Sequence, residues 1–253
     1  MSARPVTTTA AWVDLHAAAC APYRASGRWA WHWARGKLAR DPVFRALLER
    51  GDLPARARVV DIGCGQGLMA SLLQTCADMH SGSATLAAWP QAWPVKASAS
   101  TYIGIELMPR DVARADAALR QLTLTPRFVC ADMRQAPLPA CDLVVILDVL
   151  HYVDHAAQLA LLERVRDALQ PQGRLLLRVG DTASRLGFAI SQWVDRLVTL
   201  VRGHSVPPVW GRSLREWVQV LQGLGFVVRV EPQSQGTPFA NMLLVADLGS
   251  SGP

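Results

Sequence analysis

Short, continuous apolar runs alternate along the chain with longer segments in which apolar residues recur every three or four positions. The short runs predict buried strands at residues 56–63, 101–107, 126–133, 141–150 and 173–180, and a closing strand pair at 226–232 and 241–248. The longer segments predict helices at residues 12–20, 24–50, 68–77, 109–122, 155–169, 183–202 and 213–223. Strands that alternate with helices predict an α/β fold built on a doubly wound, mostly parallel sheet.

Some segments lie outside this alternation and define the expected domain organisation. The expected parts are an N-terminal helical extension or lid at 1–54, a sheet domain at 55–253, an insertion loop at 78–101 and a lid-helix insertion at 181–215. Within the N-terminal part, Asp41 is expected to cap a new helix that has Pro42 in its first turn.

Composition limits the class of protein. A chain of 253 residues that is 51% hydrophobic and 18% charged can bury a full-sized core. We find no apolar run of membrane-spanning length and no signal-peptide pattern at the N-terminus. The five cysteines form no CxxC motif, so neither a disulfide framework nor a metal site is expected. The expectation is a soluble cytoplasmic protein.

The net charge of +6 is distributed unevenly. Between Arg24 and Arg50 there are seven basic residues against only Asp41 and Glu49. Such a patch favours an acidic partner or an anionic surface, although a solvated helix face would have the same composition.

The stretch VVDIGCGQG at residues 59–67 is the most informative local pattern. A buried strand ends there in Gly63, Gly65 and Gly67, which permit positive φ and leave no Cβ between the backbone and a ligand. The bend leads to a helix N-terminus, which attracts negative charge. A dinucleotide pyrophosphate and an adenosyl group that bears a carboxylate both fit. The third glycine comes one residue too early for the dinucleotide fingerprint GxGxxG.

Acidic residues recur at four successive strand ends, and all of these ends are expected at one edge of the sheet. They are Asp61, Glu106, Asp132 and Asp148. Glu106 could accept both ribose hydroxyls of a nucleoside. Leu107 and Met108 could flank an adenine, and Asp132 suits the exocyclic amine of that base. Each acid taken alone would also fit a helix cap or a strand-end turn.

The glycine-rich loop and the four acids together resemble the class I S-adenosylmethionine-dependent methyltransferases, over about residues 55–180. The resemblance implies a Rossmann-like, seven-stranded sheet and S-adenosyl-L-methionine as the cofactor. It implies cofactor contacts from Asp61, Gly63, Gly65, Gly67, Glu106, Leu107, Asp132, Met133 and Asp148. Asp61 would orient the loop and reach the amino group of the cofactor, and Asp148 would lie near the sulfonium.

Methyl transfer to an O–H group, or to a ring carbon that loses a proton, requires a base. His151 and Tyr152 follow the fourth strand directly and are the candidate catalytic residues. His151 has an ordinary pKa of about 6.5, which suits a base at neutral pH, but a role in capping, or in supporting the residues that contact the ligands, is an equal alternative. His155 is expected on the surface, and His32 and His204 could approach the pocket from the N-terminal helices and from a loop.

The methyl acceptor has to be inferred from segments outside the sheet core, because that core is shared across many functions. The segment around YRASGRWAWHWARGKLARDPVF, with DIGCGQGL and GIELMPRDVARA, is similar to methyltransferases of bacterial aryl-polyene (xanthomonadin-type) pigment clusters. That resemblance implies a phenolic head group, methylated on oxygen or ring carbon and carried on an acidic acyl carrier protein. A quinone-precursor methyltransferase would look nearly the same.

Three further alternatives stay open at this level. The helix at 183–202 could lie on a membrane surface or roof an apolar pocket, although an ordinary buried helix face has the same stripe. A nucleic-acid-binding protein could use the basic surface, but no nucleic acid partner is expected. A scaffold without catalysis would have no reason to keep the glycines, Glu106 and Asp132.

Overall fold

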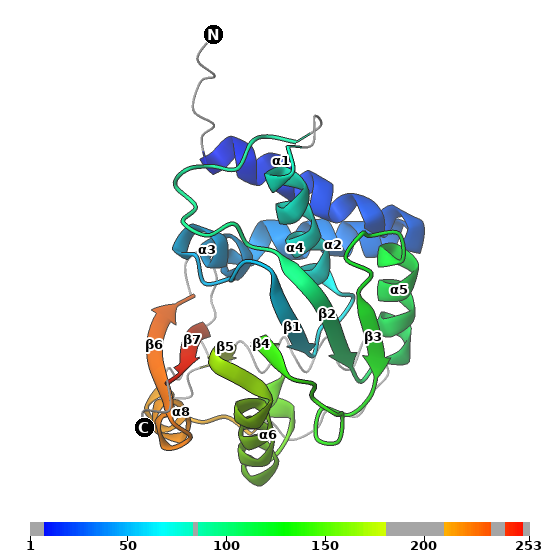
Figure 1. The fold of residues 1–253 in the computed structure, drawn as a ribbon. Coiled ribbons are helices and arrows are strands. Elements are labelled where there is room, and N and C mark those ends of the chain that lie inside the picture. Colours follow the sequence, from blue (N-terminus) through cyan, green and yellow to red (C-terminus); the bar gives the residue numbers. More distant parts are fainter. Residues whose placement is uncertain (1–7, 83–85, 181–209, 234–240, 250–253) are drawn as a thin grey trace. The chain divides into compact units, whose positions relative to one another are not determined.

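The computed structural model describes residues 8–82, 86–180, 210–233 and 241–249. Seven strands form a mostly parallel sheet in the order β3-β2-β1-β4-β5-β7-β6. The neighbouring pairs β1–β2, β2–β3 and β4–β5 are parallel, whereas β7 runs antiparallel to β5 and to β6. The predicted doubly wound α/β fold and its closing antiparallel pair are confirmed (Figure 1).

The chain divides into two compact units, residues 1–133 and 134–253. The described elements of the first unit are α1 (Thr8–Cys20), the 3-10 helix η1 (Ala21–Ser26), α2 (Arg28–Arg40), α3 (Pro42–Arg50), β1 (Ala57–Ile62), α4 (Leu68–His80), β2 (Ala99–Glu106), α5 (Pro109–Leu119) and β3 (Arg127–Cys130). Those of the second unit are β4 (Cys141–Leu147), the 3-10 helix η2 (Leu150–Tyr152), α6 (His155–Ala168), β5 (Leu169–Gly180), α8 (Leu214–Gly223), β6 (Phe226–Pro232) and β7 (Asn241–Leu248).

Local capping explains where several helices begin. The Asp41 carboxylate accepts a hydrogen bond from the Val43 N–H at 3.1 Å, and Pro42 occupies the first turn of α3, as predicted. Ser213 and Glu216 form a capping box at the start of α8. The predicted helix at 24–50 also breaks at Gly27, whose φ of 98° is strongly unfavourable for other residues.

The N-terminal helices pack into the core of the first unit. Ala11, Leu15 and Ala19 of α1 are fully buried. The Ser71 hydroxyl of α4 donates a 2.7 Å hydrogen bond to the Ala19 carbonyl, which joins the two helices. The separate extension at 1–54 stays a prediction, because the compact unit that contains these helices continues to residue 133.

Some predictions fall on other parts of the chain. The helix at 183–202, His204 and most of the insertion at 181–215 lie outside the described residues. Among the helices that the structure describes, none has the length and apolar character needed to cross a bilayer.

Candidate functional site

The glycine-rich loop joins β1 to α4 through three left-handed residues. Gly63, Gly65 and Gly67 have φ values of 75°, 55° and 75°. The N–H groups of Gly63 and Cys64 donate to the Ile105 carbonyl of the neighbouring strand, at 2.8 and 3.2 Å, and thereby anchor the loop. Gly67 then caps α4.

The glycines serve two different purposes. A Cβ on Gly67 would stand 2.6 Å from the Phe128 ring and 2.9 Å from Leu119, so the protein's own packing requires glycine there. Within the part of the chain that the structure describes, a Cβ on Gly65 would meet only Trp33 of α2, at 4.0 Å. Gly65 therefore leaves open space above the loop, whereas Gly67 allows β3 and α5 to pack against it.

Alanine at position 67 is expected to lower the free energy of unfolding by roughly 2–4 kcal/mol, because left-handed strain and overpacking add. Gly82→Ala is the matched control, since Gly82 has the same φ of 75° and no described residue lies within 4 Å of its added Cβ. It should cost only about 1 kcal/mol. Urea denaturation of both variants measures the difference. Equal losses of unfolding free energy in the two variants would show that the Phe128 ring moves aside without destabilising the protein.

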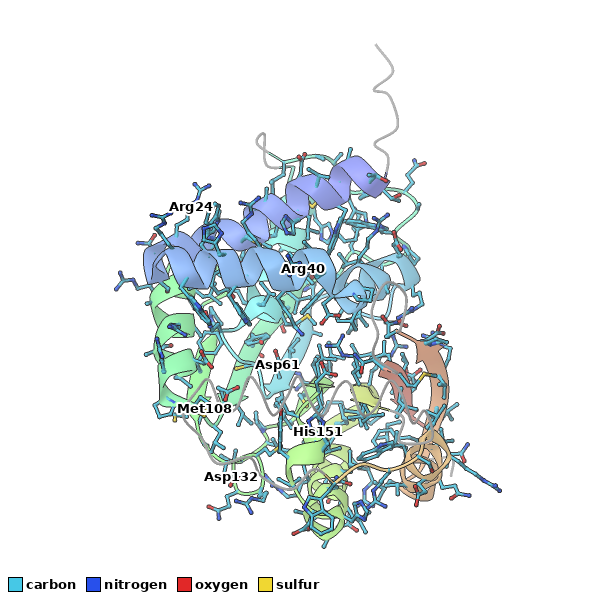
Figure 2. The ribbon with its side chains drawn as sticks, turned by 180° about the vertical axis from the view of Figure 1, so that it is seen from behind. Arg24, Arg40, Asp61, Met108, Asp132 and His151 are labelled. Atoms are coloured by element: carbon cyan, nitrogen blue, oxygen red, sulfur yellow. The ribbon has the colours of Figure 1, made fainter. Side chains whose placement is uncertain are left out.

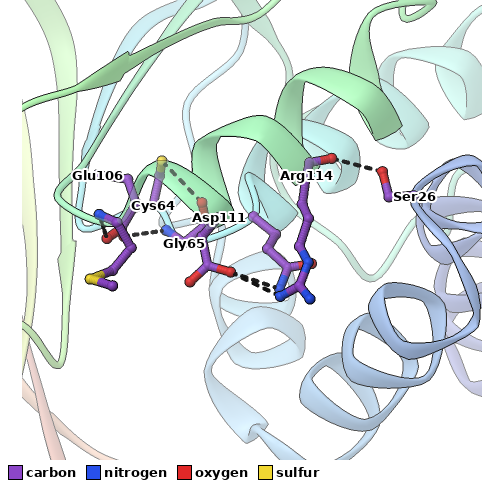
Figure 3. A network of polar contacts seen from close by, with 8 residues as sticks. Ser26, Cys64, Gly65, Glu106, Asp111 and Arg114 are labelled. Atoms are coloured by element: carbon purple, nitrogen blue, oxygen red, sulfur yellow. Dashed lines mark hydrogen bonds and ion pairs between the residues drawn. The ribbon is translucent and has the colours of Figure 1, made fainter. Parts of the chain in front are cut away.

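Glu106 ends β2 with both carboxylate oxygens fixed by the backbone. The Gly65 N–H donates to Oε2 at 3.0 Å, and the Met108 N–H donates to Oε1 at 2.9 Å (Figure 3). Each oxygen keeps a lone pair for another donor, because a carboxylate accepts about four hydrogen bonds. The half-buried carboxylate could therefore accept two neighbouring hydroxyl groups.

Asp61 lies at the end of β1 and is buried, with 5% of its surface exposed. The pKa of this carboxyl group is raised from 3.8 to about 7. Burial is the main cause, the hydrogen bond that the Tyr102 hydroxyl donates lowers the pKa, and the negative charge of Glu106 raises it. Asp61 therefore retains a proton to a higher pH than an ordinary carboxyl group does. Sequence reasoning missed Tyr102, because its contact with Asp61 depends on the register of β1 and β2.

A polar network connects η1 to the glycine-rich loop and to α5. The Tyr23 hydroxyl donates to the Gln66 carbonyl at 2.9 Å, and the Gln66 amide donates to Asp111 at 3.1 Å. Arg114 contacts Asp111 at 3.4 Å, and the Ser26 hydroxyl donates to the Arg114 carbonyl at 2.8 Å (Figure 3). No motif in the sequence indicates this network, which fixes the loop against the N-terminal helices.

Cys64, between two of the glycines, has a packing role. It is 8% exposed, and burial raises the pKa of its thiol, so the thiolate is disfavoured. A Cβ on Gly104 would stand 2.6 Å from its sulfur, so the side chain fills the space above β2. We assign Cys64 no nucleophilic function.

The other predicted adenine contacts follow β2 and β3 at one edge of the first unit (Figure 2). Leu107 is 62% exposed. Met108, Asp132 and Met133 are half-buried, and β3 ends before the last two. The structure brings these residues to the sheet edge where Glu106 lies, and their contact with a cofactor stays a prediction.

In the second unit, Asp148 follows β4 with a left-handed φ of 61°, unusual for any residue but glycine. Arg178 of β5 is 2% exposed and donates to both carboxylate oxygens of Asp148, from Nε at 2.8 Å and from Nη2. Such strain is often kept at functional positions. The ion pair with Arg178 neutralises the Asp148 carboxylate. This carboxylate would therefore attract a cationic ligand less strongly than an unpaired carboxylate at the same position.

His151 and Tyr152 lie together in η2, with ring centroids 4.2 Å apart. Burial lowers the pKa of His151, although the charge of Asp148 acts in the opposite direction. The imidazole is therefore neutral at pH 7, as a general base requires. Two other histidines are more exposed than His151. His155 is exposed, as expected, and His32, which was predicted as able to approach the pocket, is exposed on α2.

A buried glutamine fixes the backbone around His151. Gln158 of α6 is fully buried and donates to the carbonyls of Val153 and Trp210, at 3.0 and 2.8 Å. Arg212 donates to its side-chain oxygen at 2.9 Å. The Trp210 N–H in turn donates to the His151 carbonyl at 2.9 Å. The segment that begins at Trp210 thus holds η2 in place.

Comparison with known families identifies the class of protein. A family model described as a methyltransferase domain matches residues 30–229. The chain belongs to this methyltransferase family. The match begins within α2 and ends within β6, so it includes the glycine-rich loop, Glu106 and His151.

Two sets of known proteins are similar to this methyltransferase over different parts of the chain. Mouse acetylserotonin O-methyltransferase is 49% identical over 51 residues, which make up 20% of this chain and only 13% of that protein. Magnesium protoporphyrin IX methyltransferase from Synechocystis PCC 6803, with bound SAH, has a TM-score of 0.55 at 19% identity, over 84% of this chain and 83% of that one. An S-adenosylmethionine-dependent methyltransferase from Mesorhizobium loti has a TM-score of 0.55 at 22% identity, over 79% and 95%.

These neighbours share the fold of the methyltransferase and support S-adenosylmethionine as its cofactor, as the sequence predicts. The loop geometry fits that group, because Gly65 leaves space and Glu106 presents two acceptors. No group of three or more potential metal ligands comes together within the described ranges.

The raised pKa of Asp61 predicts pH-dependent cofactor affinity. A cationic amino group beside Asp61 favours its carboxylate, so binding should release a proton, and affinity should rise by up to about tenfold per pH unit below about pH 7. The ligand-free fold has the opposite dependence: it retains the proton between pH 3.8 and about 7, so this contribution to its stability falls as pH rises through that window.

Calorimetric titration at pH 6.5 in two buffers of different ionisation enthalpy counts the released protons. Asp61→Asn should remove both the release and the pH dependence. Proton uptake on binding would contradict the assignment of Asp61 to the cofactor amino group.

Proposed function

We propose that this methyltransferase transfers the methyl group of S-adenosylmethionine to a small or lipid-like acceptor with a phenolic or other aryl group. The observation that carries the proposal is the Glu106 carboxylate, held by the N–H groups of Gly65 and Met108. Two fixed acceptors beside a glycine-rich loop suit the adjacent hydroxyls of a ribose, and charge-assisted hydrogen bonds are the strong ones.

The first unit would supply most of the contacts to the cofactor. Asp61 would contact the amino group, and Glu106 the ribose. The remaining proposed contacts are the backbone of Gly63, Gly65 and Gly67, the side chains of Leu107, Asp132 and Met133 for the adenine, and Asp148 for the charged sulfur. When bound, S-adenosylmethionine supplies an electrophilic methyl group.

The chain's own contribution to the chemistry is a neutral imidazole. His151 would accept the proton that the acceptor hydroxyl loses, because its pKa is lowered by burial and it is uncharged at neutral pH. Tyr152, whose ring lies beside His151, would help to orient it. The Asp148–Arg178 ion pair fixes the strand end from which η2 follows.

An aryl acceptor is supported by two observations. The aligned segment of acetylserotonin O-methyltransferase belongs to a protein named for O-methylation. The motifs YRASGRWAWHWARGKLARDPVF and GIELMPRDVARA resemble those of aryl-polyene pigment methyltransferases. We therefore propose the phenolic head group of an aryl polyene, methylated on oxygen or on a ring carbon and carried on an acidic acyl carrier protein.

The test begins with the cofactor. Calorimetric titration with S-adenosylmethionine, S-adenosylhomocysteine and, as a control, NAD should give roughly micromolar dissociation constants for the first two only. Binding of NAD alone would overturn the proposal. Methyl transfer from labelled cofactor to hydroxybenzoates, polyhydroxylated quinone precursors and fatty acids then tests the acceptor. Transfer only to the quinone precursors would replace the aryl-polyene head group with that other class of phenol.

A further inference from the structure

A stripe of arginines lies on the outer face of the N-terminal helices. Arg28, Trp31 and Arg35 recur at the three- and four-residue spacing of one face of α2, and Arg24 of η1 joins them by contact with Trp31. We define the arginine stripe as Arg24, Arg28, Trp31 and Arg35. Its three arginines are exposed, and Figure 2 shows Arg24 pointing away from the ribbon.

The stripe differs from Lys37 and Arg45 of the same segment. Lys37 pairs with Asp41 at 2.8 Å, and Arg45 pairs with Glu49 at 2.7 Å. Among the residues that the structure describes, no carboxylate pairs with the three arginines of the stripe. Their charge is therefore available to a partner.

The stripe is also pre-arranged. The guanidinium groups of Arg24 and Arg35 lie 5.2 and 4.7 Å from the centroid of the Trp31 ring. Such cation–π contacts orient both groups before any partner arrives. A planar guanidinium held in this way can take a carboxylate through two parallel hydrogen bonds.

The opposite face of the same helices contacts the glycine-rich loop. Ala30, Ala34 and Leu38 of α2 are buried. Trp33 lies 4.0 Å from a Cβ position on Gly65, and the Tyr23 hydroxyl donates to the Gln66 carbonyl. A partner on the stripe would therefore bind helices that support the cofactor loop, without touching the loop.

We propose that the arginine stripe is the docking surface for an acidic protein, which presents carboxylates along a helix or an extended edge. The proposal goes beyond the reaction of this methyltransferase and does not depend on the acceptor. If the acceptor is carried on an acidic protein, the stripe is where that carrier would bind.

Two other anionic partners fit the stripe less well. Single-stranded nucleic acid usually stacks its bases on free aromatic faces, but the Trp31 ring already contacts two guanidiniums and His32. A membrane surface requires exposed apolar side chains beside the charges. Trp29 is the one large, strongly exposed apolar residue of α2, and the Arg114 guanidinium lies 4.2 Å from the centroid of its ring.

The probe is a soluble helical peptide with glutamates at i, i+4, i+7 and i+11, compared with a scrambled peptide of the same composition. Fluorescence anisotropy at low salt should show binding of the patterned peptide at least about tenfold tighter than the scramble. The double variant Arg28→Glu/Arg35→Glu should weaken it by roughly tenfold to a hundredfold, because like charges then oppose each other. The affinity for S-adenosylhomocysteine should not change.

Arg120→Glu/Arg215→Glu is the matched control, since it makes the same change in net charge at two other exposed arginines. It should weaken peptide binding less than threefold. Equal losses in the two double variants, or equal binding of both peptides, would overturn the proposal. It would also be overturned if only a single-stranded oligonucleotide, or only phosphatidylserine vesicles, bound the stripe in a manner that Arg28→Glu/Arg35→Glu abolished.

Discussion

Replacing Glu106 by alanine is expected to weaken binding of S-adenosylmethionine and S-adenosylhomocysteine by roughly 10²–10⁴-fold. Two hydrogen bonds from ribose hydroxyls to a charged acceptor would be lost, each worth about 1.5–3 kcal/mol. The affinity of Glu106→Gln for these ligands should lie between those of the wild type and Glu106→Ala, because one side-chain oxygen remains as an acceptor while the charge is gone.

The reason for so large an effect is that the carboxylate is fixed before the ligand arrives. The Gly65 and Met108 N–H groups hold its two oxygens, so little conformational entropy is lost on binding. In the alanine variant these N–H groups also lose their acceptor, and the loop loses one of its hydrogen bonds to β2.

Asp116→Ala is the matched control for Glu106→Ala. It removes one exposed negative charge from α5 of the same unit, and it should change the dissociation constant by less than about twofold. Calorimetry gives the affinities, and thermal unfolding without ligand shows whether each variant is folded. An unchanged affinity in a folded Glu106→Ala variant would remove the ribose assignment and with it the main support for the cofactor site.

The sequence predicted the parts of the fold that depend on nearby residues. Apolar runs located β1, β2 and β4 because strands covered on both faces read as continuous apolar segments. Asp41 located the start of α3 because capping involves residues only two or three positions apart. The acids that end β1 and β2 lie at one edge of the sheet, because the carboxyl ends of neighbouring parallel strands lie on the same side.

Contacts between distant residues could not be read in this way. Tyr102 reaches Asp61 and Phe128 fills the space left by Gly67 only because the strands adopt a particular register. Arg178 reaches Asp148 across 30 positions in the sequence. A pattern of residue types predicted which acids end the strands, whereas the pKa of Asp61 and the ion pair of Asp148 depend on contacts with residues distant in the sequence.

Substituting glutamine for His151 is expected to lower kcat for a phenolic acceptor by roughly 10²–10⁴-fold, the usual contribution of a general base. Glutamine keeps hydrogen-bonding groups but cannot accept the proton. Affinity for the cofactor should stay within about threefold, so the loss would appear in kcat. The wild-type pH profile should have an acid limb below pH 6.5, because burial lowers the pKa of His151, and the variant should lack it.

His155→Gln is the matched control, because this histidine lies in the same segment but is exposed, with its ring 5.6 Å from Trp210. It should retain nearly full kcat. A series of substituted phenols adds a second readout: the loss in His151→Gln should grow as the phenol pKa rises, since less acidic hydroxyls depend more on a base. If kcat and the acid limb both survive in His151→Gln, the base is another group, and the neutral imidazole of η2 serves only to hold the backbone that Gln158 and Trp210 fix.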